Sequence, residues 1–215
     1  MFELKPAPGL AGQFEVLKHR IMASLNGLGG QPIVLAVTSC EAGEGKTTVA
    51  SNFAASLAED RAGRVLLIDA DVRTKSLHTV FGQERAPGLT DVVVSLDARW
   101  PVFRAGENLD VLFTGTEISE PGRIFLTDKF RNLINGVKRK YSFTVIDCPP
   151  LIGKDGLVTA PAKADAVILV VQAERVRREI IQRAVAHLES AGARILGVVL
   201  NKRRHRIPRF IYKMI

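Results

Sequence analysis

The chain has 215 residues, 47% of them hydrophobic and 24% charged, which is typical of a globular domain with a full hydrophobic core. Its formal net charge of +8 predicts an acidic partner, such as a nucleotide, an anionic lipid surface, a nucleic acid or an acidic protein face. The two cysteines, Cys40 and Cys148, are too few for a disulfide framework or a structural zinc site, and they favour a reducing compartment. The first eight residues lack the apolar run of a signal peptide. Apolar runs reach about eight residues, far short of the ~20 that a membrane-spanning helix needs.

Short apolar runs alternate with helical patterns along the chain. A helical pattern over Phe14–Leu25 comes first, followed by a Gly-rich connector. Buried parallel strands are predicted by short runs rich in β-branched residues, at Ile33–Thr38, Val65–Ile68, Leu109–Phe113, Phe143–Ile146, Ala166–Val171 and Ile195–Leu200. Helices are predicted at Thr47–Glu59, Ile124–Lys140 and Val176–Ala191. This alternation predicts an α/β fold, with a doubly wound, mainly parallel sheet and helices on both faces. Ligands of such sheets bind beyond the carboxyl ends of the strands.

We divide the chain into three parts: an N-terminal helix and connector (1–31), a central domain (32–201) and a basic tail (202–215). The tail holds six Lys or Arg and no acid, interleaved with Ile, Phe, Tyr and Met. This mixture favours an anionic membrane surface or the cytoplasmic segment of a membrane protein. No nucleic-acid-binding motif accompanies the tail, so we expect no nucleic-acid partner.

A phosphate-binding loop is predicted directly after the first strand. The segment reads Cys40-Glu41-Ala42-Gly43-Glu44-Gly45-Lys46-Thr47-Thr48 and lies between a predicted strand and a predicted helix, as the Walker A pattern of P-loop NTPases requires. Gly43 and Gly45 let the backbone curl, so that N–H groups point at phosphate oxygens beside the positive end of the helix. Lys46 can supply charge to the β- and γ-phosphates of ATP, and the Thr47 hydroxyl can ligate magnesium. Thr48 can donate to the α-phosphate.

Two further strands end in carboxylates. Asp69-Ala70-Asp71-Val72-Arg73 follow one strand, and Asp147-Cys148-Pro149-Pro150 follow another. A lone aspartate after a strand is usually a helix cap or a turn former. Three aspartates at the edge that also carries the phosphate loop are better explained as a magnesium site, since Mg²⁺ takes oxygen ligands and keeps several waters.

These three motifs together resemble the bacterial tyrosine kinases of capsule and exopolysaccharide synthesis. That family carries a Gly-Glu-Gly-Lys-Ser/Thr loop, an Asp-x-Asp-x-Arg motif after an apolar strand, and an Asp-x-Pro-Pro motif. The chain matches them at 43–47, 69–73 and 147–150. The likeness extends from about Phe14 to Lys202, where Asn201 corresponds to a family residue near the adenine.

The resemblance implies an ATP- and Mg²⁺-dependent protein tyrosine (auto)kinase that regulates capsule or exopolysaccharide synthesis and export. The implied catalytic residues are Lys46, Asp69 and Asp71, and either aspartate could accept the tyrosine proton. The implied nucleotide-binding residues are Gly43, Glu44, Gly45, Lys46, Thr47, Thr48, Arg73 and Asn201. The implied metal ligands are Thr47, Asp71 and Asp147. Such domains occur fused to a membrane chain-length regulator or as separate chains, and this chain looks like the separate form. We therefore expect a cytoplasmic protein that reaches the inner membrane through the cytoplasmic segment of such a regulator.

The chain departs from the family pattern in three places. The family's leading helix carries a Glu-x-x-Arg-x-x-Arg element for ring assembly, where this chain has Gly12, Glu15 and Lys18. This weighs against family-type rings, and self-association stays open. The family usually ends in a tyrosine cluster, whereas this tail has only Tyr212, and we interpret Tyr141 as structural. Cys40 stands where the usual Walker A pattern begins with Gly.

Two alternatives remain. The first is an ATP-driven switch of the partition or division-site type, whose loop carries an early lysine where this chain has Glu41. The second is an accessory factor of polysaccharide export that binds ATP without autophosphorylation, which the sparse tyrosines favour.

Overall fold

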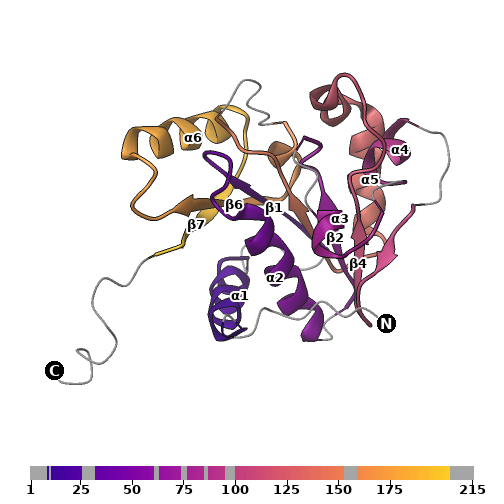
Figure 1. Ribbon diagram of the computed structural model, residues 1–215, viewed down its shortest axis with the longest axis horizontal. Coiled ribbons are helices and arrows are strands. Elements are labelled where there is room, and N and C mark those ends of the chain that lie inside the picture. The colour runs from indigo at the N-terminus through magenta and orange to yellow at the C-terminus, as the bar shows by residue number, and fades with distance from the viewer. Residues whose placement is uncertain are drawn as a thin grey trace.

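A computed structural model describes residues 9, 11–25, 32–60, 63–73, 77–84, 87–94, 100–152 and 159–203. In these residues seven strands form one sheet in the order β3-β4-β2-β5-β1-β6-β7 (Figure 1). The strands are β1 (Ile33–Ser39), β2 (Val65–Asp69), β3 (Phe103–Arg104), β4 (Leu109–Leu112), β5 (Phe143–Asp147), β6 (Ala166–Gln172) and β7 (Ile195–Asn201). All neighbouring strands are parallel except β3, which pairs antiparallel with β4. The six predicted strands are confirmed.

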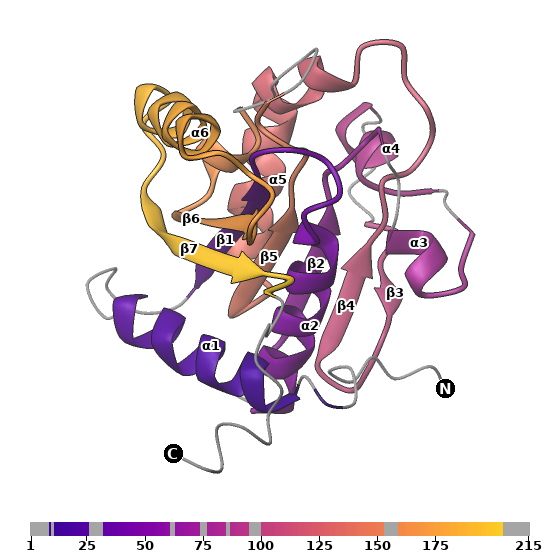
Figure 2. The ribbon, with the colours of Figure 1, turned by 60° about the vertical axis from the view of Figure 1, so that its left-hand side comes forward.

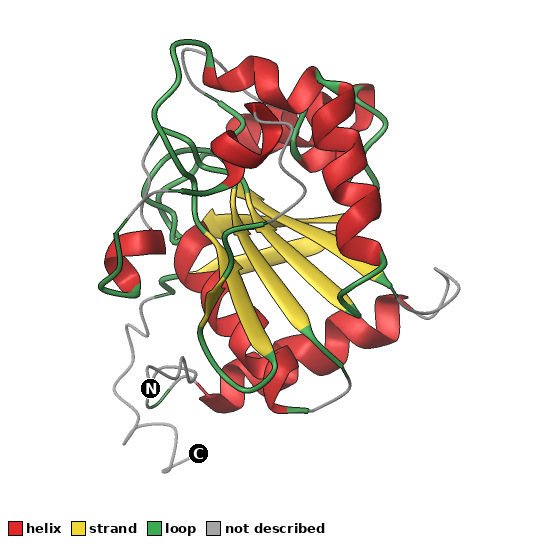
Figure 3. Ribbon diagram, turned by 90° about the vertical axis from the view of Figure 1, so that its right-hand side faces the viewer, coloured by secondary structure: helices red, strands yellow, loops and turns green. Residues whose placement is uncertain are grey.

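Helices cover both faces of the sheet (Figure 3). The helices are α1 (Ala11–Leu25), α2 (Lys46–Glu59), α3 (Leu77–Val80), α4 (Leu89–Val94), α5 (Asp128–Lys138) and α6 (Arg178–Ser190), with 3₁₀ turns η1 (Pro121–Leu126) and η2 (Pro161–Lys163). Alternate residues of a strand point to opposite faces. Leu35 and Val37 accordingly pack in a cluster with residues of α1 and α2, and Val34 and Ala36 in one with residues of α5 and α6. The doubly wound α/β fold is thus confirmed.

The helix predicted at Ile124–Lys140 is interrupted. Residues Pro121–Leu126 form a 3₁₀ turn, and α5 begins only at Asp128. Thr127 between them is extended, at φ −81° and ψ 150°. Its hydroxyl oxygen accepts a hydrogen bond of 3.2 Å from the Phe130 backbone N–H, so Thr127 is the N-cap of α5. In the sequence, Thr127 followed by Asp128 is a typical start of a helix. The apolar pattern around this pair continues without a gap, so it predicted one long helix.

Helix α1 is joined to α2 and to the residue that follows it by ion pairs and hydrogen bonds around the buried Lys18. The Lys18 side chain is only 3% exposed, and its ammonium lies 2.6 Å from Asp60 and 2.9 Å from Glu15. The Ser56 hydroxyl on α2 donates to Glu15 at 2.8 Å. The residues at two of the three positions of the family's ring element therefore bind within this chain.

Tyr141 is a structural residue, as expected from the sequence. It is 5% exposed, and its hydroxyl donates to Asp110 at 2.8 Å. Asp110 is also paired with Arg64, whose guanidinium lies over the Tyr141 ring. Burial, followed by the contact with Asp110, raises the pKa of the phenol.

The last strand, β7, lies at one edge of the sheet and is more exposed than the strands inside it. Val198 is 54% exposed and Leu200 is 58% exposed, although the sequence predicted a buried strand. Among the described residues, no helix combines the length and the apolar character needed to cross a membrane.

Candidate functional site

The carboxyl ends of three strands bring the sequence motifs together. Strand β5 lies between β1 and β2, and Asp147 at its end is in register with Asp69 on β2 and Val37 on β1. The strands are parallel, so the loop that follows β1 lies at the same edge of the sheet as the carboxyl ends of β2 and β5 (Figure 2). Asp69 and Asp147 are the last residues of those two strands. This is the edge at which doubly wound sheets bind ligands.

The loop after β1 encloses a cavity of about 340 Å³. The cavity is lined by Ala42, Gly43, Gly45, Lys46, Thr47, Thr48, Asp71, Pro150 and Lys202. Gly45 precedes α2 in the left-handed conformation, at φ 94°, with no side-chain cap on the helix. A Cβ at Gly45 would lie 2.3 Å from the Asn201 amide nitrogen, so the loop needs glycine there for both conformation and space. The uncapped start of α2 thus opens its backbone N–H groups toward an anion.

Residues from the ends of β6 and β7 hold this loop in place. The Glu44 carboxylate is buried and accepts hydrogen bonds from the backbone N–H groups of Glu41, at 2.8 Å, and Gln172, at 3.2 Å. The Asn201 side-chain amide donates to the Glu44 carbonyl at 2.9 Å. The Glu44 side chain is therefore engaged by the protein, and a contact of Glu44 with nucleotide would have to come from its backbone.

Lys46 lies deep in the site, paired with acids. The residue is 7% exposed, and its ammonium is 2.5 Å from Asp71 and 3.8 Å from Asp147. Burial opposes the positive charge, but the attraction of Asp147 and Asp71 outweighs it and raises the pKa of Lys46. Lys46 therefore carries a permanent charge at the floor of the cavity.

Asp69 and Asp71 have different environments. Asp69 accepts hydrogen bonds from the backbone N–H groups of Asp71, at 3.2 Å, and Leu77, at 3.3 Å. It is fully buried, and burial raises its pKa to about 6. Asp71 lines the cavity, whereas Asp69 does not. The geometry thus separates two residues that the sequence left equivalent.

Asp147 is buried without a hydrogen-bond donor. Within the part of the chain that the structure describes, neither of its carboxylate oxygens has a hydrogen-bond partner. Burial raises its pKa to about 7, and the nearby Lys46 ammonium and Thr47 hydroxyl lower it only in part. A buried carboxylate without a donor fits a site built for a cation.

The donor set suits magnesium bound together with a nucleotide. Among the described residues no three His, Cys, Asp or Glu side chains gather to hold a metal by themselves. Mg²⁺ usually needs only one or two carboxylates, with phosphate oxygens and water completing its shell. Thr47, Asp71 and Asp147 offer that combination beside the cavity.

The remaining expected residues are less central. Arg73 is exposed, two positions beyond Asp71, and its assignment to the nucleotide stays a prediction. Cys40 and Cys148 are fully buried, and burial raises the pKa of Cys40 to about 12. Cys40 is thus a small neutral packing residue at the first loop position.

Sequence reasoning missed Lys202 and Pro150 as cavity residues. The sequence placed Pro150 in the Asp-x-Pro-Pro motif and Lys202 at the start of the tail, without a role for either side chain at the cavity. Lys202 directly follows Asn201, and that adjacency was the available signal.

Comparison with known proteins gives concordant results. The family model described as ParA, NUBPL iron-transfer P-loop NTPase, matches residues 32–211. The tyrosine-protein kinase CpsD of Streptococcus pneumoniae serotype 4 is 36% identical over 177 residues, which cover 79% of this chain and 75% of CpsD. A CpsD of Streptococcus agalactiae is 31% identical, covering 93% of this chain and 86% of that protein. The chain spans only 24% of the length of another relative, EpsB of Ralstonia solanacearum.

Solved structures show the same fold. The chimerical protein CapA2B2 superimposes with a TM-score of 0.84 at 25% identity, covering 93% of this chain and 88% of that one. The kinase domain of the Escherichia coli tyrosine kinase ETK gives a TM-score of 0.85 at 23% identity, covering 94% and 80%.

Replacing Asp147 by Asn should stabilise the ligand-free protein at pH 8. The carboxylate is largely ionised there, and the Lys46 ammonium 3.8 Å away offsets the cost of its burial only in part, so the neutral amide should raise the free energy of unfolding by about 1–3 kcal/mol. Because the folded-state pKa is raised to about 7, the carboxyl's contribution to stability is present below its unfolded pKa and lost as pH rises through 7. The gain from Asn should therefore shrink at pH 5. Urea unfolding in EDTA at both pH values measures this.

Asp165→Asn provides the control, because Asp165 accepts hydrogen bonds from Lys138 and from the Val34 backbone N–H. That variant should lose stability at pH 8. An Asp147→Asn variant that is also less stable at pH 8 would contradict the assignment of an ionised carboxylate whose burial is compensated only in part.

Proposed function

The chain belongs to the ParA-type P-loop NTPases and, among them, to the family of the CpsD tyrosine-protein kinases, and we propose that it transfers phosphate from ATP to tyrosine. The polysaccharide context of the family suggests that the reaction regulates capsule or exopolysaccharide synthesis and export. The observation that supports the proposal most is the cavity bounded by the glycine loop, Lys46 and the carboxylate of Asp71, next to Asp147.

The geometry suits phosphoryl transfer because this reaction needs positioning and charge neutralisation more than covalent chemistry. The loop N–H groups and Lys46 would hold the phosphates of ATP, and Thr48 would contact the α-phosphate. Thr47, Asp71 and Asp147 would hold magnesium, which when bound neutralises charge on the phosphate oxygens. Lys46 would have to exchange its contact with Asp71 for phosphate oxygens, which leaves Asp71 available.

We assign different roles to the two aspartates after β2. Asp71 reaches the cavity, so it is the candidate for contact with the metal or with the attacking hydroxyl. Asp69 accepts hydrogen bonds from the backbone N–H groups of Asp71 and Leu77, so we propose that it positions the backbone at Asp71.

An accessory ATP-binding role is the second candidate. The observation that favours it is the burial of Tyr141, which leaves Tyr212 as the one remaining tyrosine of the sequence for autophosphorylation. In that case the nucleotide would act as a ligand that sets a conformation and not as a phosphate donor.

Lys46→Ala should abolish nucleotide binding while the protein stays folded, because it removes the buried charge at the floor of the cavity. Asp71→Ala should reduce phosphoryl transfer at least tenfold with a smaller effect on ATP affinity, because Asp71 is expected to stabilise the transition state more than the bound substrate. Asp69→Ala should also lower transfer, through the position of Asp71. Fluorescent ATP-analogue titration and phosphate transfer from labelled ATP measure the two effects.

Near wild-type affinity in a folded Lys46→Ala protein would remove the basis of the nucleotide site. Turnover at the wild-type rate in both aspartate variants would instead leave a nucleotide site without the proposed chemistry.

Tyrosine replacement separates the kinase from the accessory protein. In wild type incubated with ATP and magnesium, we expect phosphotyrosine, lost in Tyr212→Phe and retained in Tyr141→Phe because the Tyr141 hydroxyl is buried against Asp110. Phosphotyrosine mass spectrometry on the purified chains reads this out. Wild-type protein that binds ATP but never gains phosphotyrosine, alone or on an added tyrosine peptide, would favour the accessory role.

We further propose that the protein is cytoplasmic and reaches the inner membrane through a chain-length regulator, with its basic tail as the main contact. Most of that tail, 204–215, lies outside the described residues. Each basic residue near an anionic surface contributes about 1 kcal/mol at most, and salt screens it. Lipid affinity alone should therefore be weak, and a protein partner is needed.

A chain that ends at Arg203 should lose membrane association in cells that express the regulator, while it keeps Lys202 at the loop. Cell fractionation with and without the regulator measures this, and ATP binding by the truncated chain is the control for folding. Association that survives truncation would place the docking surface elsewhere. Salt-resistant binding of the full chain to pure anionic vesicles would show that no partner is required.

A further inference from the structure

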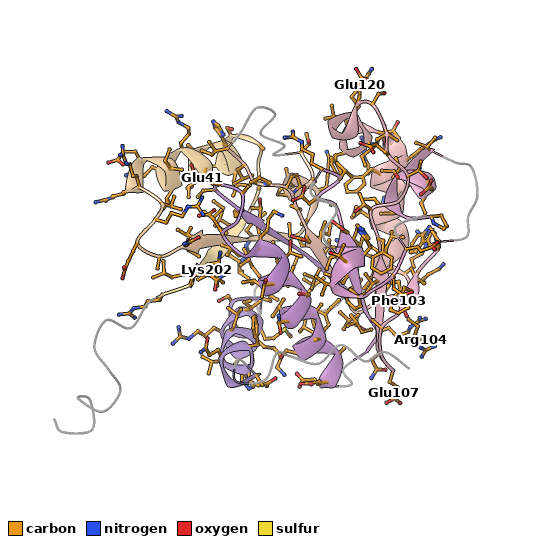
Figure 4. The ribbon with its side chains drawn as sticks, in the orientation of Figure 1. Glu41, Phe103, Arg104, Glu107, Glu120 and Lys202 are labelled. Carbon is orange, nitrogen blue, oxygen red and sulfur yellow. The ribbon has the colours of Figure 1, made fainter. Side chains whose placement is uncertain are left out.

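The wall of the cavity carries a second positive charge besides Lys46. Among the described residues that line it, Lys202 is the other basic side chain. It lies at the end of β7, near the loop that carries Glu41 (Figure 4). Lys46 is buried and paired with acids, whereas Lys202 is exposed. Its charge therefore comes to the loop from the solvent side.

The backbone at Lys202 adopts an unfavourable conformation. Its φ is 55°, in the left-handed region that residues other than Gly, Asn and Asp seldom occupy. The Lys202 N–H donates to the Asn201 side-chain oxygen at 2.9 Å, while the Asn201 amide holds the Glu44 carbonyl. This turn directs the Lys202 side chain back over Gly45. Strained residues held by their surroundings gather at functional sites.

The ammonium of Lys202 has a replaceable partner. It donates to the Gly43 carbonyl at 2.6 Å, and a neutral carbonyl is a weaker acceptor for a cation than a phosphate oxygen. An ammonium has three donors on a flexible stem, so it can change partner by rotation about side-chain bonds. The loop next to it is the part of the chain that curls its N–H groups for an anion.

We propose that Lys202 is a second phosphate-contacting residue. Its ammonium would give up the hydrogen bond to the Gly43 carbonyl and bind the polyphosphate of the nucleotide in the loop. The proposal rests on the proposed function of this site and deepens it. Lys46 and Lys202 would then hold the phosphates from opposite sides, one from the floor of the cavity and one from its solvent-facing wall.

The test compares three variants of the full chain. Lys202→Asn removes the charge but tolerates the left-handed backbone, Lys202→Arg keeps the charge, and Arg203→Asn removes an equal charge from the next residue, which does not line the cavity. Calorimetric titration with MgATP, MgADP and adenosine gives the affinities. For Lys202→Asn we expect about tenfold weaker binding of both phosphorylated ligands, as for a lost charged hydrogen bond, with adenosine unchanged. The other two variants should resemble wild type.

Binding of MgATP should also depend less steeply on salt in Lys202→Asn than in Arg203→Asn, because a direct contact is removed. Equal MgATP affinity in these two variants would overturn the inference and leave the proposed function intact. Equal losses for adenosine and MgATP in Lys202→Asn would show that Lys202 only braces the loop. A wild-type chain that binds no nucleotide would overturn both proposals.

Discussion

The ion pair between Lys46 and Asp71 is the interaction around which the site is organised. Three fully buried aspartates, Asp69, Asp71 and Asp147, lie at the same edge of the sheet as Lys46. The Lys46 ammonium pairs with Asp71 and Asp147. Buried charges are tolerated when they are paired and hydrogen-bonded. Asp69 satisfies this with backbone N–H groups and Asp71 with Lys46, but no described residue donates a hydrogen bond to Asp147. The three carboxyl groups at these strand ends therefore outnumber the one ammonium that, among the described residues, is buried with them.

This excess of carboxyl groups over buried ammonium favours binding of a cation at the strand ends. A nucleotide alone would bring more negative charge and draw Lys46 away from Asp71. A nucleotide that arrives with magnesium supplies a positive charge to the carboxylates in the same event. The fold holds this arrangement rigidly, because the loop is tied to the ends of β6 and β7 through Glu44 and Asn201.

The sequence predicted what depends on local pattern. Buried parallel strands are recognisable as apolar runs rich in β-branched residues, so the sequence alone places β1, β2 and β5, and the residues at their ends, together. The differing environments of Asp69 and Asp71 could not be predicted, because they depend on the Leu77 backbone and on which carboxylate faces the cavity.

The missed features share a physical origin in tertiary contacts. The Glu44 carboxylate points into the protein because the Gln172 backbone N–H reaches it from β6. Lys202 reaches the site because its backbone is left-handed, a conformation that lysine seldom adopts and that the sequence therefore does not predict. Thr127 interrupts a helix whose apolar pattern runs on unbroken, and β3 has only two residues. Sequence periodicity detects long regular elements and carries little information on such contacts.

The two edges of the sheet are unequal, and this limits how the sheet can be extended. At one end β3 offers two residues, one of them the charged Arg104. At the other, β7 offers seven residues with no charge and with exposed Val198 and Leu200. Short, charged edges resist pairing with another strand, whereas long apolar edges invite it. As far as the described residues go, a further strand, from this chain or from another molecule, would add at β7, directly beside the residues that brace the phosphate loop.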